Sequence, residues 1–228
     1  MERKEIICSA YRMTGGNNFY DGMITCSTLS GKAVCRLVWA MNKAENNDYL
    51  EKTLSGISEN FSGKLLEVPV GTGILTMPVY QTMPEADITC LDYSADMMKQ
   101  AREKAERLHL KNVTFQQGDV GALPYADGAF DIVLSLNGFH AFPDKEAAYR
   151  EVFRVLRVGG IFCGCFYVAG EQKRTDWFVR HMYEKMGFFT PPYETTFSLK
   201  KRLEKLYAAA TFGTVKSMAW FVCRKADQ

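Results

Sequence analysis

The stretch that decides the fold runs from Leu65 to Gly73 and reads LLEVPVGTG. Its mostly apolar first part predicts a buried strand from Leu65 to Val70, and Gly71-Thr72-Gly73 predicts a tight turn. A glycine-rich turn between a strand and a helix lets the backbone approach a ligand closely and points free N–H groups at it. Many structural turns carry two glycines, so this turn needs support from the residues around it.

Apolar runs of strand length alternate with helical patterns after this turn, which is typical of parallel β-α-β units. We expect helices at 73–83, from the N-cap Ser94 onward, and before Gly159-Gly160, where a positive φ can end a helix. We expect strands at 88–91, 113–115, 130–136 and 161–168. The tail predicts helices at 171–187 and 198–209, then a last strand or hairpin at 212–224.

The first 62 residues differ in character from the rest. Turn-rich patches at 15–18 and 46–48 lie on either side of a helical run at 32–43. We therefore expect residues 1–62 to form a helical extension and residues 63–228 to form a single α/β domain, because 228 residues suit one large core.

The composition excludes several classes of protein. Hydrophobic residues make up 47% and charged residues 24%, as in ordinary globular proteins. The net charge is +2 and the cationic side chains are scattered, which argues against nucleic acid as a partner. We expect no membrane partner, because no run approaches the roughly 18 apolar residues of a spanning helix.

The seven cysteines are odd in number and scattered, so we expect buried thiols in a reducing, cytoplasmic environment. They are Cys8, Cys26, Cys35, Cys90, Cys163, Cys165 and Cys223. The three histidines lie far apart and none has a Cys or His partner near it in sequence. We therefore expect no metal site.

Two carboxylates follow the next two predicted strands. Asp92 ends the second strand, where an acidic side chain can accept hydrogen bonds from both hydroxyls of a ribose. Asp119 follows the third strand, where it can accept a bond from an adenine amino group, with the N–H of Val120 facing the ring. Because doubly wound sheets bind ligands at the carboxyl ends of their strands, these residues and the glycine turn predict one nucleoside site.

A nicotinamide cofactor is the first alternative for this site. A dinucleotide fingerprint that begins at Gly71 requires glycine at position 76, where the chain has Thr76. A fingerprint that begins two residues earlier meets Pro69. A pyrophosphate loop, and with it a nicotinamide-dependent oxidoreductase, is therefore disfavoured.

The combined motifs resemble the class I S-adenosylmethionine-dependent methyltransferase superfamily, in the small-molecule branch similar to ubiquinone and menaquinone biosynthesis methyltransferases. An acidic residue followed by a glycine-rich turn matches at Glu67, Gly71 and Gly73, and the acidic residue after the second strand matches at Asp92. Further matches lie at Gly118-Asp119, Leu123-Pro124, Phe130-Asp131 and Leu156 to Gly160. The resemblance covers roughly residues 60–168.

The resemblance implies a Rossmann-like, doubly wound, mostly parallel seven-stranded sheet with an antiparallel last strand and helices on both faces. It implies S-adenosylmethionine as cofactor and S-adenosylhomocysteine as product. The expected cofactor-binding residues are Glu67, Pro69, Gly71, Gly73, Asp92, Tyr93, Met97, Asp119, Val120 and Asn137. Two residues depart from the family pattern: Pro69 replaces its first glycine and removes a backbone donor, and Val158 replaces a proline.

The resemblance also implies transfer of the sulfonium methyl group, which needs little beyond in-line alignment because the donor is already activated. His140 follows the fourth strand and is either a general base or a residue at the entry of a helix. A protein that binds the cofactor without catalysis is the alternative function. The sequence leaves the acceptor, the methylated atom and the oligomeric state open.

Aromatic residues gather in two segments outside the matched core, and the resemblance places such additions over the acceptor. They are Phe19, Tyr20, Trp177, Phe178, Tyr183, Phe188, Phe189 and Tyr193. We expect residues 169–210 to be a helical insertion on the substrate side, with Tyr20 and Trp177 contacting a small, partly apolar or aromatic acceptor. The alternative is that these rings pack in the core.

Overall fold

The computed structural model describes residues 19–226; Cys8 and the side chain of Phe19 lie outside that description. Seven strands form one sheet in the order β3-β2-β1-β4-β5-β7-β6. The strands are β1 (Lys64–Glu67), β2 (Asp87–Asp92), β3 (Val113–Gln117), β4 (Phe130–Leu136), β5 (Leu156–Tyr167), β6 (Ala209–Val215) and β7 (Met218–Arg224). β7 lies antiparallel to β5 and β6, and β1 to β5 pair in parallel. The predicted fold class is confirmed.

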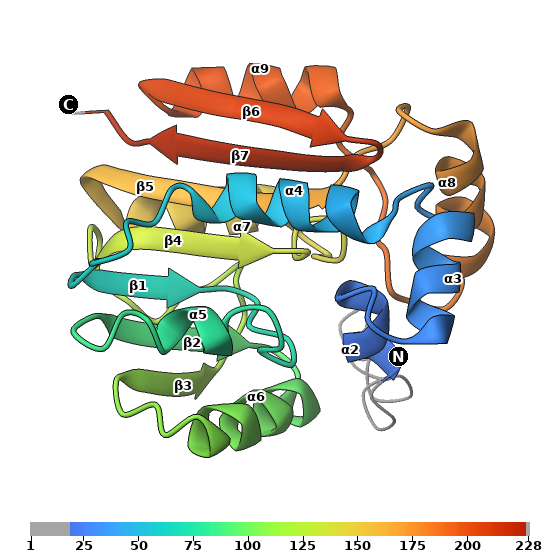
Figure 1. Ribbon diagram of the computed structural model, residues 1–228. Helices are drawn as coiled ribbons and strands as arrows, with labels where there is room; N and C mark the ends of the chain where they lie inside the picture. The colour runs from blue at the N-terminus through green and yellow to red at the C-terminus, as the bar shows by residue number, and fades with distance from the viewer. Residues whose placement is uncertain (1–18, 227–228) are drawn as a thin grey trace.

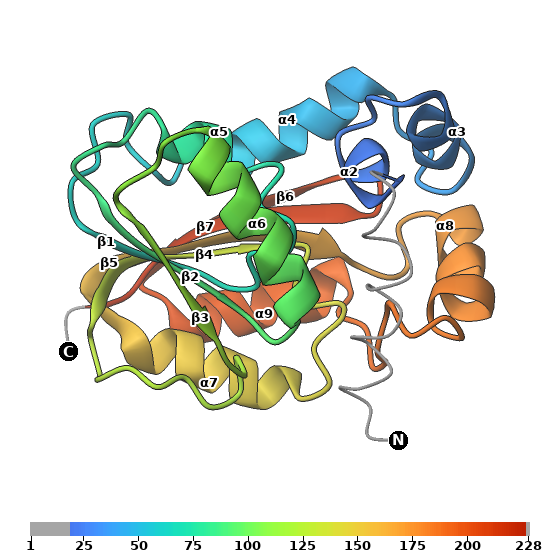
Figure 2. The ribbon, with the colours of Figure 1, turned by 90° about the horizontal axis from the view of Figure 1, so that it is seen from below.

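Helices cover both faces of this sheet. Figures 1 and 2 show α4 (Lys43–Leu54), α5 (Met77–Tyr80) and α6 (Ala95–Arg107) on one face, and α7 (Lys145–Val155) and α9 (Thr196–Leu206) on the other. Four further helices, α2 (Phe19–Ile24), α3 (Leu29–Leu37), α8 (Lys173–Phe178) and the π-helix η1 (Val179–Tyr183), lie beyond the carboxyl ends of the parallel strands. Among the described residues, no helix combines the length and the apolar character required to cross a bilayer.

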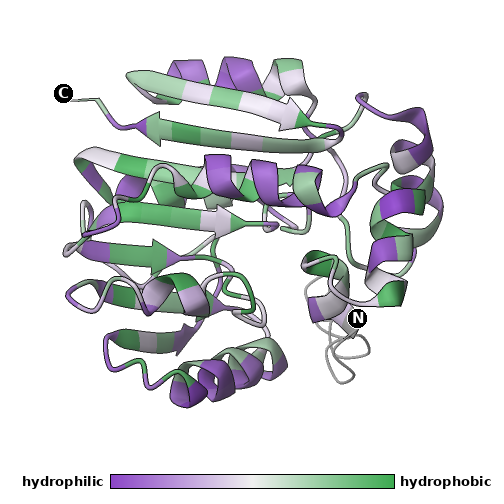
Figure 3. Cartoon of the chain, viewed as in Figure 1, coloured by the Kyte–Doolittle hydropathy of each residue, from purple (hydrophilic) through white to green (hydrophobic). Residues whose placement is uncertain are grey.

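The core has two apolar layers, one on each face of the sheet. Successive strand residues point to opposite faces, so Leu65 packs in one layer and Leu66 in the other, and both are fully buried. Figure 3 shows the result as hydrophobic strands between helices with hydrophilic outer surfaces. Burial on both faces explains why the central strands are continuous apolar runs in the sequence.

The turn after β1 is longer than predicted. β1 ends at Glu67 and the next helix, α5, covers only Met77–Tyr80 instead of 73–83. Gly71 and Gly73 have φ values of +55° and +69°, which break any helix there. Pro78, in the first turn of α5, lacks the N–H that would continue a helix backward. The segment between β1 and α5 is therefore irregular, and hydrogen bonds of the Val70, Gly71 and Gly73 N–H groups hold it at the sheet edge.

Two other predicted boundaries were wrong. α7 ends at Val155 and β5 begins directly at Leu156, so Gly159-Gly160 lies inside the strand and does not end the helix. Gly159 has the expected positive φ of +71°, but this conformation serves an irregularity in the β4–β5 pairing.

The predicted helix at 32–43 is also wrong, because two helices occupy this region. α3 ends at Leu37, Ala40 has a φ of +55°, and Asn42 begins α4 with a capping box in which it exchanges hydrogen bonds of 2.9 Å with Glu45. The expected turn at 46–48 therefore lies inside α4, where Asn46 is buried. The Asn46 side chain donates a hydrogen bond to the Ile24 carbonyl, 22 residues earlier in the chain, and local sequence does not reveal this contact.

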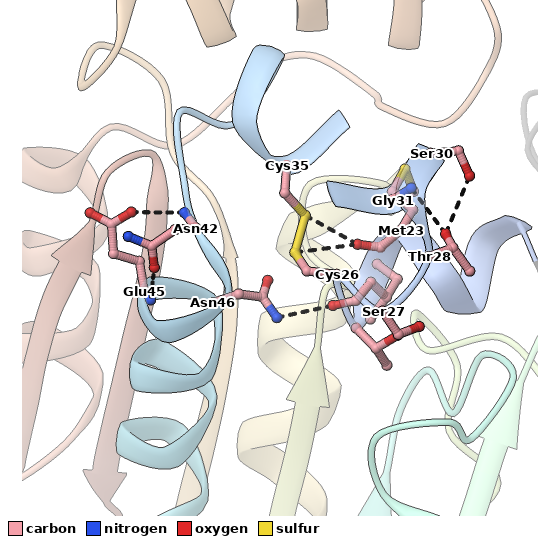
Figure 4. Close-up of a disulfide and its surroundings, with 12 residues drawn as sticks. Met23, Cys26, Ser27, Thr28, Ser30, Gly31, Cys35, Asn42, Glu45 and Asn46 are labelled. Carbon is pink, nitrogen blue, oxygen red and sulfur yellow. Dashed lines mark hydrogen bonds between the residues drawn. A yellow bond between two sulfur atoms is a disulfide. The ribbon is translucent and has the colours of Figure 1, made fainter. Parts of the chain in front are cut away.

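The cysteine prediction holds for four residues and is wrong for two. Cys90, Cys163, Cys165 and Cys223 are buried free thiols. Cys26 and Cys35 instead form a disulfide, with a Cα–Cα distance of 6.4 Å (Figure 4). The chain reverses at Cys26, whose φ is +49°, so that α3 packs against α2 and brings the two sulfur atoms together. Cysteine spacing in the sequence does not reveal this pairing.

Candidate functional site

Two adjacent cavities lie at the carboxyl edge of the parallel strands. The first cavity, about 120 Å³, is bounded by the turn at 67–76, by the residues that follow β2, β3 and β4, and by α2. The second cavity, about 270 Å³, lies between α2, α3, α4 and the segment 182–189. Tyr20, Ile24 and Asn137 line both cavities, so the two spaces meet at these residues.

The glycine turn shapes the floor of the first cavity. A Cβ at Gly73 would come within 2.9 Å of Met77 and 3.2 Å of Ala101, so this glycine permits close packing. A Cβ at Gly71 would meet no heavy atom within 4 Å, so the backbone there faces open space. The Gly71 N–H donates to Asp92 Oδ2 over 2.8 Å, which ties the turn to the end of β2.

Asp92 is a buried carboxylate at the centre of this edge, with only 7% of its surface exposed. Its Oδ1 accepts a hydrogen bond of 2.8 Å from the Ser94 N–H. Burial raises the pKa of Asp92 to about 6, against the backbone hydrogen bonds from Ser94, Gly71 and Tyr93, which lower it. The side chain is therefore ionised at neutral pH and available as an acceptor.

Glu67 is the second buried carboxyl in the first cavity, 1% exposed. The Tyr80 hydroxyl donates to its Oε2 over 2.8 Å, and the Cys90 thiol lies 3.6 Å from the same oxygen. Burial raises the pKa of Glu67 to about 8, more than these hydrogen bonds lower it. Glu67 is therefore mainly protonated near pH 7.

The first cavity brings together every residue predicted to bind the cofactor. These are Glu67, Pro69, Gly71, Gly73, Asp92, Tyr93, Met97, Asp119, Val120 and Asn137. Asp119 Oδ1 accepts a hydrogen bond of 3.0 Å from the Gly121 N–H, which shapes the loop after β3. The Val68–Pro69 peptide is cis, and a Cβ at Gly138 would overlap Pro69 and Phe142. Position 138 therefore has no room for a side chain.

Sequence reasoning missed the role of α2 in closing this cavity. Thr72, inside the glycine turn, donates its hydroxyl proton to Asp21 Oδ1 over 2.5 Å. Lys104 Nζ lies 3.0 Å from Asp21 Oδ2, and both side chains are mostly buried. Asp21 thus links α2 to the glycine turn through Thr72 and to α6 through Lys104. No motif predicts this contact, because Asp21 and Thr72 lie 51 residues apart.

The second cavity has a different lining, made almost entirely of apolar and aromatic side chains. Its lining includes five methionines: Met23, Met41, Met182, Met186 and Met218. No Asp, Glu, Lys or Arg of the described chain lines it. Methionine side chains are flexible and polarizable, so such walls adapt to ligands of different shape.

Some of the predicted lid aromatics line these cavities and others do not. Tyr20 lines both cavities, while Tyr183, Phe188 and Phe189 line the second. Trp177 is 53% exposed, stacks on His181 at 4.7 Å between ring centroids, and lines neither cavity. The remaining two rings, Phe178 and Tyr193, pack against Trp177 and against Tyr167 and Phe189 respectively. The structure therefore does not bring Trp177 to the site.

His140 lines the second cavity, yet its environment is that of a structural residue. It is 6% exposed, and its ring stacks on Phe189 with the centroids 4.0 Å apart. Nδ1 accepts a hydrogen bond of 3.2 Å from the Tyr167 N–H, and burial lowers the pKa of His140 to about 3. This bond assigns the proton of the neutral ring to Nε2, which leaves no free lone pair to receive another. Of the two sequence interpretations, this arrangement favours the non-catalytic one.

Asn137 lines both cavities and has an unusual backbone conformation. Its φ is +55°, a conformation that asparagine tolerates better than most residues, and its N–H donates to the Cys165 carbonyl over 2.8 Å. The turn directs the chain away from β4 at the point where the cavities meet.

Comparison with known proteins adds a family to this geometry. A family model described as a methyltransferase domain matches residues 61–210. A demethylmenaquinone methyltransferase of Thermus thermophilus is 40% identical over 97 residues, which are 42% of this chain and 44% of that protein. A 2-methyl-6-phytyl-1,4-hydroquinone methyltransferase of Oryza sativa is 31% identical over 126 residues, 55% of this chain and 34% of that protein. The matches thus span less than half of these relatives.

Solved structures show the same fold at low sequence identity. The DhpI–SAH complex has a TM-score of 0.64 and 22% identity, with 99% of this chain and 98% of that chain covered. The cyclase SpnF has a TM-score of 0.66 and 18% identity, with 82% and 83% covered. The name of the second neighbour states an activity and that of the first does not, so the shared fold leaves the reaction to be argued from the site.

Proposed function

Since the chain belongs to the methyltransferase-domain family, we propose that it transfers the sulfonium methyl group of S-adenosylmethionine to a small, partly apolar or aromatic acceptor. One observation carries this proposal. The first cavity gathers all the residues expected to hold the cofactor, and it meets an apolar second cavity at Tyr20, Ile24 and Asn137.

The residues of the first cavity fit the parts of this cofactor. Asp92, ionised and buried, suits the two ribose hydroxyls, and Asp119 with the Val120 N–H suits the adenine edge. Gly71, with open space before it, lets the backbone approach the methionine part. The buried Glu67 lies in the same wall, and a positive charge of the bound cofactor beside it would favour its ionised form.

The chemistry needs alignment more than acid or base groups. A lone pair of the acceptor forms the new bond to the methyl carbon while the carbon–sulfur bond breaks, and its electron pair stays on the now neutral sulfur. The acceptor then releases one proton to solvent. His140 does not receive it, because its Nδ1 is occupied by the Tyr167 N–H. The protein contributes binding, orientation and exclusion of water by α2.

The second cavity supports a small molecule as the acceptor. Its volume of about 270 Å³ and apolar walls suit a ring compound, and its enclosure differs from the open basic surface that nucleic acid requires. The matched relatives are named for demethylmenaquinone and for a phytyl hydroquinone, which supports the same class of acceptor. We propose that η1, together with α2 and α3 of the extension 1–62, covers this side of the domain 63–228. Within the expected insertion 169–210, α9 packs against β6 instead.

We propose a cytoplasmic location on the four buried free thiols, although a disulfide such as Cys26–Cys35 is rare in reducing compartments. Reduction of the Cys26–Cys35 bond tests this proposal, because a cytoplasmic protein must bind its cofactor under reducing conditions. Cofactor affinity that survives a dithiol reductant supports the location, and affinity that is lost with reduction contradicts it.

A second candidate is a protein that binds the cofactor without transferring its methyl group. The cyclase SpnF has the same fold, so binding of the cofactor without methyl transfer is the alternative to test. Incubation with S-adenosylmethionine and a panel of hydroquinones, phenols and amines separates the two, with S-adenosylhomocysteine as the measured product. We expect formation of that product to depend on a panel member and to fail in Asp92→Ala. Tight cofactor binding with product only at the acceptor-free background would reject methyl transfer to these classes.

A further inference from the structure

The second cavity has one buried polar corner. Asn46 and Tyr49 of α4 and Asn137 after β4 contribute it, and Asn46 and Tyr49 are each 3% exposed. The Tyr49 hydroxyl donates to Asn46 Oδ1 over 3.3 Å, and Asn46 Nδ2 donates to the Ile24 carbonyl over 3.1 Å (Figure 4 shows Asn46 directed toward the end of α2). Since Ile24 and Asn137 line both cavities, this corner lies where the acceptor would meet the methyl group.

The Tyr49 hydroxyl keeps acceptor capacity in this arrangement. It uses its proton toward Asn46, and its oxygen interacts with the Asn137 side chain and can still accept from one further donor. Burial raises the pKa of Tyr49 above its ordinary value, Cys165 adds to this rise, and the Asn137 side chain opposes it. Tyr49 therefore stays neutral at physiological pH and can exchange a hydrogen bond but does not act as a charged base.

Among the described residues, the rest of the second cavity has no side chain that would stabilise a charged ligand. No Asp, Glu, Lys or Arg of the described chain lines it, and its one histidine is held neutral with Nδ1 occupied. Transfer of an ionised group into such a space is costly without a partner of opposite charge. A carboxylated or phosphorylated acceptor is therefore excluded, whereas a neutral hydroxyl has partners at the polar corner.

The geometry points to Tyr49 as the residue that determines acceptor specificity: together with Asn137 it binds one hydroxyl group of an uncharged ring compound, whose O–H donates to the Tyr49 oxygen and whose remaining surface packs against the aromatic and methionine walls. This inference rests on the proposed function. It assigns the class of acceptor, a neutral phenol or hydroquinone, to named side chains outside the cofactor motifs. Asn46 acts through Tyr49, as a positioning residue that also ties α4 to α2.

Three related probes test this inference on the full chain saturated with S-adenosylhomocysteine. They are 1-naphthol, naphthalene, which lacks the hydroxyl, and 1-hydroxy-2-naphthoate, which adds a carboxylate. Equilibrium dialysis measures the affinity of each. We expect 1-naphthol to bind about fivefold or more tighter than naphthalene, the effect of one buried hydrogen bond, and to bind at least about tenfold tighter than the carboxylate. The probe series in the unchanged protein tests the class of acceptor, and a variant tests the residue that selects it.

The variant Tyr49→Phe removes only the hydroxyl and keeps the Asn46–Ile24 bond. We expect the ratio of 1-naphthol to naphthalene affinity to fall to within about twofold of unity, with naphthalene affinity unchanged. A purely structural role would lower both affinities or the melting temperature and leave the ratio intact. Tyr207→Phe is the matched control, because its hydroxyl is buried without a hydrogen-bond partner in the described structure and lines neither cavity.

Four results would overturn the inference: equal binding of 1-naphthol and naphthalene, equal or tighter binding of the carboxylate, an unchanged ratio in Tyr49→Phe, or no binding of any probe to protein that holds S-adenosylhomocysteine. Failure of the proposed function has a different signature. In that case the chain does not bind S-adenosylhomocysteine in the first step of the experiment, before any probe is added.

Discussion

The two cavities are neighbours with opposite origins. The first is built from short segments that directly follow β1, β2, β3 and β4, and its shape comes from backbone turns tied together by Asp92. The second is built from α2, α3, α4, the segment 182–189 and Met218 of β7, which are far apart in the chain. Parallel strands deliver their carboxyl ends to one edge by topology alone, whereas the second cavity exists only after distant helices pack.

Their electrostatics differ in the same way. The first cavity holds two buried carboxyl groups, Glu67 and Asp92, whose pKa values are raised by burial to about 8 and about 6. The second cavity has no charged wall residue in the described chain. A polar, cationic cofactor fits one side and a neutral acceptor fits the other, so changes on the two sides should affect different ligands.

The largest expected effect belongs to Asp92→Ala. It removes the acceptor of the Gly71 and Ser94 N–H bonds as well as the acceptor for the ribose, so affinity for S-adenosylhomocysteine should fall by about 2 to 3 kcal/mol. Isothermal titration calorimetry measures this loss. Asp87→Ala, at the exposed start of the same strand, is the control and should bind normally. Equal affinities of the two variants would remove the basis of the cofactor assignment.

Loss of the Cys26–Cys35 bond should act mainly on the second cavity, because Cys35 lies in its wall. The bond closes a short loop across a sequence separation of 9, so its removal should lower the local stability of α2 and α3 by about 2 kcal/mol. In the double variant Cys26→Ser/Cys35→Ser, amide hydrogen exchange in these helices should be roughly 30-fold faster, with exchange in β4 unchanged. Equal rates in the unchanged protein and the variant would show that Asp21 and the helix packing already hold this segment.

A smaller effect is expected from Tyr20→Ala. Its ring lines both cavities, so turnover of an acceptor should fall by about tenfold, which is about 1.4 kcal/mol, with the melting temperature nearly preserved. Trp177→Ala should change neither turnover nor cofactor affinity, because that ring is half-exposed and outside both cavities. Steady-state kinetics on both variants makes the comparison. A selective loss of turnover in Trp177→Ala would place α8 over the acceptor after all.

The smallest effect concerns pH. Burial raises the pKa of Asp92 to about 6, so the carboxylate is ionised above that pH and loses acceptor capacity as pH falls through it. Affinity for S-adenosylhomocysteine should therefore decrease by less than about tenfold between pH 7.5 and pH 5.5. The raised pKa also means that ionisation of Asp92 lowers the free energy of unfolding as pH rises from about 4 to about 6. Asp92→Asn should flatten the affinity profile, and a wild-type profile already flat would contradict the assignment.

Much of the first cavity was predictable from local sequence. Gly71 to Gly73, Asp92 and Asp119 were each predicted at or just after the end of a strand, and the strand at Phe130–Leu136 was predicted with its observed ends. The errors lie where local patterns conflict with packing: 46–48 resembles a turn yet lies in α4, and Gly159-Gly160 resembles a helix stop yet lies in β5.

Local sequence was sufficient for the alternating strands and helices and for the ligand edge they create, because turn glycines, caps and apolar runs act over a few residues. The acceptor side depended on long-range contacts. Three features join segments that only the packed helices bring together: the Cys26–Cys35 bond, the hydrogen bond from Thr72 to Asp21, and the polar corner around Tyr49. Even the protonation of His140 was decided this way, since its environment comes from β5 and Phe189, 27 and 49 residues further along the chain.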